Sequence, residues 1–114
     1  MNKDIFFMFH SWRDCQLAFL DKGNSSAPVI LLLHGFASSL RANWLFPNWI
    51  KFLCDAGFRV VALDHLGHGE SDKPRDPAFY NLVLMAADAV SLLDFLGISK
   101  AHVIGYSMGA RIAT

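Results

Sequence analysis

The residues Val-Ile-Gly-Tyr-Ser-Met-Gly-Ala, at positions 103–110, place Ser107 between two glycines directly after an apolar run. The apolar run predicts a strand and the residues after Ser107 predict the start of a helix, which is the setting in which Gly-x-Ser-x-Gly carries a nucleophile. A serine on so tight a strand-to-helix turn has a strained backbone, and its hydroxyl stands clear of the sheet. Side chains two positions before and two after the serine would collide, which explains Gly105 and Gly109.

The segments before this turn alternate between strand and helix patterns. Two short strands joined by a bend at residues 13–14 predict an N-terminal hairpin. The next strand is apolar at every position, as is typical of a strand buried on both faces of a parallel sheet. The predicted strands are 4–9, 16–20, 28–33, 58–63 and 101–105. A loop is predicted over 36–43. Two helices are predicted: one has Pro47 in its first turn and stops at Gly57, and the other covers 82–96. This order predicts an α/β fold, with an N-terminal β-hairpin followed by a mostly parallel sheet with alternating helices.

Composition argues against several classes of function. Ten basic residues balance ten acidic ones, so charge gives no reason to expect nucleic acid or an anionic membrane as a partner. No apolar run reaches the roughly 18 residues that span a bilayer, and the first residues lack a secretory-signal pattern. Cys15 and Cys54 have no metal-type spacing and neither do the histidines. We therefore expect reduced cysteines, no metal, no cofactor and a cytoplasmic protein.

Two backbone amides are candidates for holding negative charge near Ser107. The Met108 amide lies at the start of the predicted helix, where backbone donors favour an anion. An oxyanion formed when Ser107 attacks a carbonyl would point there. A second donor is expected from the loop after strand 28–33, where the sequence His-Gly-Phe supplies the Phe36 amide.

Three segments together resemble the N-terminal half of an α/β-hydrolase fold serine hydrolase. They are Leu-Leu-Leu-His-Gly-Phe at 31–36, Asp-His-Leu-Gly-His-Gly-Glu-Ser-Asp-Lys-Pro at 64–74, and His-Val-Ile-Gly-Tyr-Ser-Met-Gly-Ala at 102–110. The resemblance covers nearly the whole chain. It implies that Ser107 is the nucleophile, with Phe36 and Met108 as oxyanion donors. It also implies structural roles near the site for His34, Gly35, Gly105 and Gly109.

The identity of the nucleophile narrows the chemistry that the resemblance implies. Family members that displace halide or open epoxides carry an aspartate at the elbow, whereas this chain carries Ser107. Serine points to acyl transfer on a small-molecule acyl substrate. The bond cleaved is that of an ester, thioester, lactone, amide or C–C substrate.

The groups that would activate Ser107 are not evident in the sequence. A serine hydroxyl needs a base, and the base needs an orienting acid. In this fold both follow the serine, so we expect both after Thr114. His102 lies roughly 16 Å from Ser107 along the same strand, and His34 is expected to be structural.

We therefore expect residues 1–114 to be the N-terminal portion of a single α/β-hydrolase domain, truncated after the elbow and inactive alone. Two interpretations stay open. One is a serine hydrolase, and the other is a catalytically silent binding or interaction module of the same fold. The sequence does not set the oligomeric state.

Overall fold

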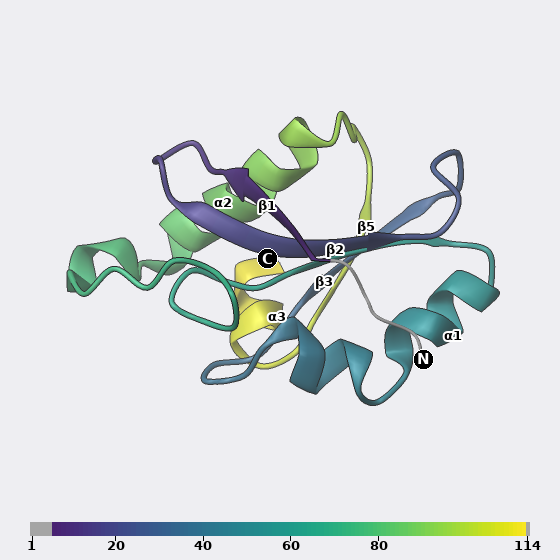
Figure 1. Ribbon diagram of the computed structural model, residues 1–114, viewed down its shortest axis with the longest axis horizontal. Helices are drawn as coiled ribbons and strands as arrows, with labels where there is room; N and C mark the ends of the chain where they lie inside the picture. The colour runs from purple at the N-terminus through teal and green to yellow at the C-terminus, as the bar shows by residue number, and fades with distance from the viewer. Residues whose placement is uncertain (1–5, 114) are drawn as a thin grey trace.

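Five strands form one mixed sheet, in the order β1-β2-β4-β3-β5, in the computed structural model, which describes residues 6–113 (Figure 1). They are β1 (Phe7–His10), β2 (Gln16–Lys22), β3 (Val29–Leu33), β4 (Arg59–Leu63) and β5 (His102–Gly105). β1 and β2 form the predicted hairpin, and β2 continues antiparallel beside β4. β3 lies parallel between β4 and β5. The predicted α/β fold, a hairpin followed by parallel strands, is confirmed.

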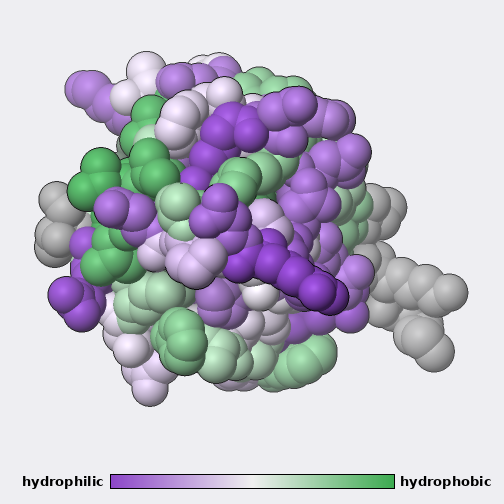
Figure 2. Space-filling model, turned by 90° about the vertical axis from the view of Figure 1, so that its left-hand side faces the viewer, coloured by the Kyte–Doolittle hydropathy of each residue, from purple (hydrophilic) through white to green (hydrophobic). Residues whose placement is uncertain are grey.

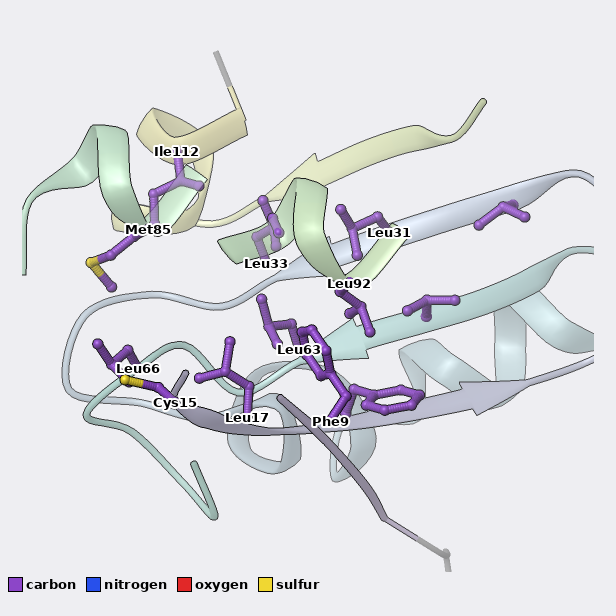
Figure 3. Packing of buried hydrophobic residues seen from close by; sticks show 14 residues of the cluster. Phe9, Cys15, Leu17, Leu31, Leu33, Leu63, Leu66, Met85, Leu92 and Ile112 are labelled. Carbon is purple, nitrogen blue, oxygen red and sulfur yellow. The ribbon is translucent and has the colours of Figure 1, made fainter. Parts of the chain in front are cut away.

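Two apolar layers lie on opposite faces of this sheet, because neighbouring strand residues point to opposite sides. All five residues of β3 are buried, with Leu31 and Leu33 in one layer and Ile30 and Leu32 in the other. The first layer packs against α2 (Leu82–Phe95) and α3 (Met108–Ala113), and the second against α1 (Trp49–Asp55). Figure 3 shows the first layer with Met85, Leu92 and Ile112 packed against strand residues.

The helix α2 begins at Leu82, as the sequence predicts, and ends at Phe95, one residue before the predicted end. The Asn81 side chain accepts hydrogen bonds from the Val83 and Leu84 amides, at 2.7 and 3.4 Å, and so caps the first turn. Gly97 follows the helix with a φ of 71°, a left-handed conformation that glycine adopts without strain.

The segment between β3 and α1 differs from the prediction. A π-helical turn, η1 (Arg41–Leu45), occupies part of the expected loop over 36–43. Pro47 lies in the turn that follows, and α1 starts only at Trp49 after Asn48, whose φ is 67°. The sequence suggested Pro47 in the first helical turn because proline suits that position, but the preceding π turn places the helix start two residues later. Likewise, β1 spans Phe7–His10 rather than 4–9, with residues 4 and 5 outside the described range.

The hairpin is fastened to α2 through a buried ion pair. Arg13, in the bend between β1 and β2, contacts both carboxylate oxygens of Asp88 in α2, at 3.0 and 2.6 Å. It also donates at 2.9 Å to the carbonyl of Phe79, the last residue of the 3-10 turn η2 (Pro77–Phe79). The side chains of Arg13 and Asp88 are 9% and 2% exposed, so this pair is almost fully removed from water.

The surface has an open edge at β5. This strand pairs with β3 on one side, and its residues Val103 and Ile104 are each 41% exposed.

Figure 2 shows the side of the molecule at the left of Figure 1, where hydrophobic residues gather toward one edge and hydrophilic ones cover much of the rest. Among residues 6–113, none of the helices has the length and apolar character needed to cross a membrane.

Candidate active site

Ser107 lies on the sharp turn that joins β5 to α3. Its φ is 55°, an uncommon conformation for a non-glycine residue, and it is exposed. The turn is fixed on both sides by backbone hydrogen bonds. The Tyr106 amide donates to the Leu33 carbonyl at 3.1 Å, and the Gly109 amide donates to the Tyr106 carbonyl at 2.9 Å. The predicted strand–turn–helix geometry around Ser107 is therefore present, with the strain stored at the serine itself.

The two glycines that flank the serine have no room for a side chain. A Cβ placed on Gly109 would overlap the Leu33 carbonyl oxygen, because α3 starts directly above the end of β3. A Cβ on Gly105 would overlap the backbone of Gly109 itself. In both cases the obstacle is backbone, which has less freedom to move than a side chain. The turn can therefore form only with glycine at these two positions.

The loop after β3, which carries Phe36, is held by side chains on both sides of that residue. The Gly35 amide donates to the Asn43 side-chain oxygen at 2.8 Å. The Ala37 amide donates to Nε2 of His68 at 3.1 Å, and Ala37 itself has a φ of 57°. Neither the Phe36 nor the Met108 amide hydrogen has an acceptor among residues 6–113.

His34 hydrogen-bonds at the start of the loop that carries Phe36. Its Nδ1 lies 2.7 Å from the Gly35 carbonyl, and its Nε2 accepts the His65 amide at 3.0 Å. These two partners require a neutral ring with its hydrogen on Nδ1. Burial lowers the pKa of His34 below its ordinary value, which favours the same neutral form. Because both ring nitrogens are engaged, His34 has no lone pair left to accept the Ser107 proton.

His65 and Asp64 connect the same loops. Burial, followed by the neighbouring His34 and His68, lowers the pKa of His65 to about 3, and its ring packs 4.4 Å from that of His34. Asp64 accepts the Leu40 amide and the Glu70 amide, each at 2.9 Å. A Cβ on Gly69 would overlap the Asp64 carboxylate. Asp64 therefore joins the loop after β4 to the start of the π turn.

A cavity of about 480 Å³ adjoins the two candidate donors. Phe36 and Met108, whose amides are the predicted oxyanion donors, both line it. The wall opposite comes from the loop after β4 and the start of α2. The remaining lining residues are Ala37, Gly67, His68, Tyr80, Leu82 and Met85. Most of these side chains are apolar, so the cavity offers an apolar surface beside the turn that carries Ser107.

None of the five histidines in the chain is placed to act as a base for Ser107. His34 and His68 use both ring nitrogens on other partners, and His65 is buried within the cluster they form. His10 belongs to β1, on the opposite edge of the sheet, and His102 starts β5. In the part of the chain that the structure describes, no cluster of three His, Cys, Asp or Glu side chains is suited to a metal.

Two residues that hold the site were not singled out for this role by the sequence. Asn43 contacts Gly35 because the π turn directs it back toward the loop, and π-helical turns give no clear local sequence signal. His68 makes one contact within its own loop, where its Nδ1 lies 3.0 Å from the Leu66 carbonyl oxygen. Its second bond, to Ala37, spans 31 residues and could not be read from sequence spacing.

A comparison with protein families decides the relationship. A family model described as the alpha/beta hydrolase fold matches residues 28–114. The chain belongs to the α/β-hydrolase fold family. The predicted resemblance to this family is therefore confirmed.

Relatives of this α/β-hydrolase chain include epoxide hydrolases and a synthase. Epoxide hydrolase 3 of Siraitia grosvenorii is 37% identical over 77% of this chain and 27% of its own length. A putative 2-succinyl-6-hydroxy-2,4-cyclohexadiene-1-carboxylate synthase of Bacillus subtilis is 35% identical over 84% of this chain and 33% of its own. Epoxide hydrolase A from Mycobacterium thermoresistibile superposes with a TM-score of 0.87 at 29% identity, over 97% of this chain and 34% of that one. The chain thus spans about a third of the length of its relatives.

Proposed function

We propose that this chain supplies the nucleophile and the oxyanion donors of a serine hydrolase that acts on acyl compounds. Ser107 Oγ attacks the carbonyl carbon, and the carbonyl oxygen becomes an anion that accepts the Phe36 and Met108 amide hydrogens. The acyl group stays on Ser107 as the leaving group departs, and water then releases it. The observation that carries the proposal is the exposed serine at a φ of 55° on the turn between β5 and α3.

The proton of Ser107 must go to a base that residues 6–113 do not provide. Each of the five histidines is engaged elsewhere, buried or on a distant part of the sheet. The base and its orienting acid are therefore expected from outside these residues, in keeping with the order Ser, acid, His in this fold. Residues 1–114 alone are expected to lack turnover that depends on Ser107.

Epoxide opening is the second candidate, since several relatives bear that name. The residue at the elbow argues against it, because family members that open epoxides carry an aspartate there and this chain carries Ser107. The synthase relative indicates that the shared segment does not fix one chemistry. In the protein as the cell makes it, we therefore expect hydrolysis of p-nitrophenyl acetate and no hydrolysis of styrene oxide.

Labelling with a fluorophosphonate, which reacts with activated serines, tests the proposal. The protein as the cell makes it is compared with residues 1–114 alone, each beside its Ser107→Ala variant. The proposal expects labelling at Ser107 in the protein as the cell makes it, and none in its Ser107→Ala variant or in residues 1–114 alone. Absence of labelling in the protein as the cell makes it would support the silent binding or interaction module instead. Labelling of residues 1–114 alone would show that a base lies within them.

A further inference from the structure

The Phe36 peptide is flanked by two anchored neighbours. The Gly35 amide is bonded to Asn43, and the Ala37 amide is bonded to Nε2 of His68. Phe36 is 75% exposed and contributes little packing that could fix the peptide. The direction of the Phe36 amide therefore depends on the hydrogen bonds made by the residues on either side.

The anchor at Ala37 holds a conformation that is unfavourable by itself. Ala37 has a φ of 57°, in the left-handed region that costs an L-residue roughly 1–2 kcal/mol. Ala37 is exposed and lies inside the turn 35–38, which the Ser38 amide closes by donating to the Gly35 carbonyl at 3.3 Å. The bond from the Ala37 amide to His68 is thus the contact between this strained residue and the neighbouring loop.

His68 is itself fixed for this task. Its Nδ1 lies 3.0 Å from the Leu66 carbonyl, which accepts a hydrogen from that nitrogen. A neutral ring with its hydrogen on Nδ1 presents a lone pair on Nε2, and this lone pair is what the Ala37 amide requires. The His68 ring is further packed between the His34 ring, at 5.1 Å, and the Phe36 ring, at 6.0 Å.

We propose that His68 is a positioning residue for the oxyanion hole, which aims the Phe36 amide at the developing negative charge by holding the Ala37 amide. The inference rests on the proposed function of the same site. It gives the histidine of the loop after β4 a role in catalysis without contact with the substrate. Hydrogen-bond donors stabilise a developing negative charge best when they are already in place before the reaction. His68 holds the Phe36 amide in that position.

The first test needs no activity and no substitution. An N–H···N hydrogen bond transmits a nitrogen–nitrogen coupling that NMR detects, and nitrogen shifts report which ring nitrogen carries the hydrogen. The proposal expects a coupling between the Ala37 amide and Nε2 of His68, with the hydrogen on Nδ1. A hydrogen on Nε2, or no coupling to Ala37, would overturn it.

The second test compares two substitutions of similar size. His68→Gln keeps an acceptor near the position of Nε2, whereas His68→Phe keeps a ring and removes the acceptor. The proposal expects the Ala37 amide to exchange its hydrogen about tenfold faster in His68→Phe, with a shifted Phe36 amide resonance, and both effects to be reversed in His68→Gln. Equal behaviour of the two variants would overturn the proposal. If His68→Phe does not fold, the coupling in the wild-type chain still decides.

The third test separates positioning from structural support by kinetics on p-nitrophenyl acetate, in the protein as the cell makes it. His68→Phe is expected to lower kcat about 10- to 100-fold at unchanged KM, less than the loss of a whole oxyanion donor, and His68→Gln to restore it. A change in KM with kcat unchanged would overturn the positioning role of His68. A protein with the coupling but without turnover dependent on Ser107 refutes the proposed function and leaves the anchoring of Phe36 by His68 supported.

Discussion

Replacing Arg13 with methionine tests the packing of the hairpin on α2. The substitution keeps an unbranched apolar stem and removes both bonds to the Asp88 carboxylate, whose side chain is 2% exposed. Removing one partner of a buried ion pair typically costs about 3–5 kcal/mol, because the remaining charge stays buried and unpaired. We expect a loss near the lower end of about 3 kcal/mol at pH 7, since Asp88 can take up a proton. The measurement is the free energy of unfolding from urea denaturation followed by tryptophan fluorescence.

The pH dependence of this loss has a definite sign. Burial raises the pKa of Asp88 and the Arg13 guanidinium opposes that rise, so the pKa of Asp88 rises further without Arg13. In the folded variant, Asp88 then binds a proton more tightly than it does in the unfolded chain. The stability of the variant therefore increases as the pH falls from the raised pKa toward 3.8, the ordinary pKa of an aspartate. The deficit of Arg13→Met relative to wild type should shrink over that window.

The matched control is Lys51→Met, which removes the partner of Asp55 in an ion pair whose side chains are 73% and 65% exposed. Exposed pairs contribute little, so this variant should unfold like the wild type. The double variant Arg13→Met with Asp88→Leu should recover much of the loss, because it leaves no buried charge. An Arg13→Met chain as stable as Lys51→Met, or a deficit that grows as the pH falls, would refute the reasoning.

Three other outcomes follow from the structure. Gly109→Ala should lower the melting temperature and abolish labelling of Ser107, since its Cβ would overlap the Leu33 carbonyl oxygen; normal labelling would contradict the steric argument. His65→Leu should make the free energy of unfolding fall less steeply as the pH is lowered. Burial lowers the pKa of His65 to about 3, so the wild type loses on the order of 4 kcal/mol as the pH falls from about 6.5 toward that value; equal slopes in urea titrations would count against it. Asn81→Ala should cost about 1 kcal/mol in thermal unfolding through loss of the cap on α2, and no change would show the cap to be dispensable.

Local sequence signals predicted the elements that depend on local physics. The all-apolar run before His34 indicated a strand buried on both faces, and β3 is buried throughout. The helical pattern over 82–96 predicted α2, and Asn81 caps two amides at its start. The glycines around Ser107 predicted a tight turn, and their Cβ positions are blocked by backbone. In each case the residues that carry the sequence signal lie within a few positions of one another.

Contacts between distant segments were out of reach of the sequence. The bend at residues 13–14 looked like a matter of hairpin geometry alone, yet Arg13 reaches Asp88 across 75 positions. The π turn that directs Asn43 to Gly35 has no periodic signature, because it replaces a stretch that had the composition of a loop. The bond from Ala37 to His68 depends on two loops meeting at the carboxyl end of the sheet. The cytoplasmic location and the roles of Ser107, Phe36 and Met108 stay predictions.

The most direct test of the central claim is a crystal structure of the protein, as the cell makes it, after reaction with a fluorophosphonate. The account predicts a phosphonyl group on Ser107 Oγ, with one oxygen about 2.7–3.1 Å from both the Phe36 and the Met108 amide nitrogens. A label on another residue, or a phosphonyl oxygen turned away from these two amides, would contradict it.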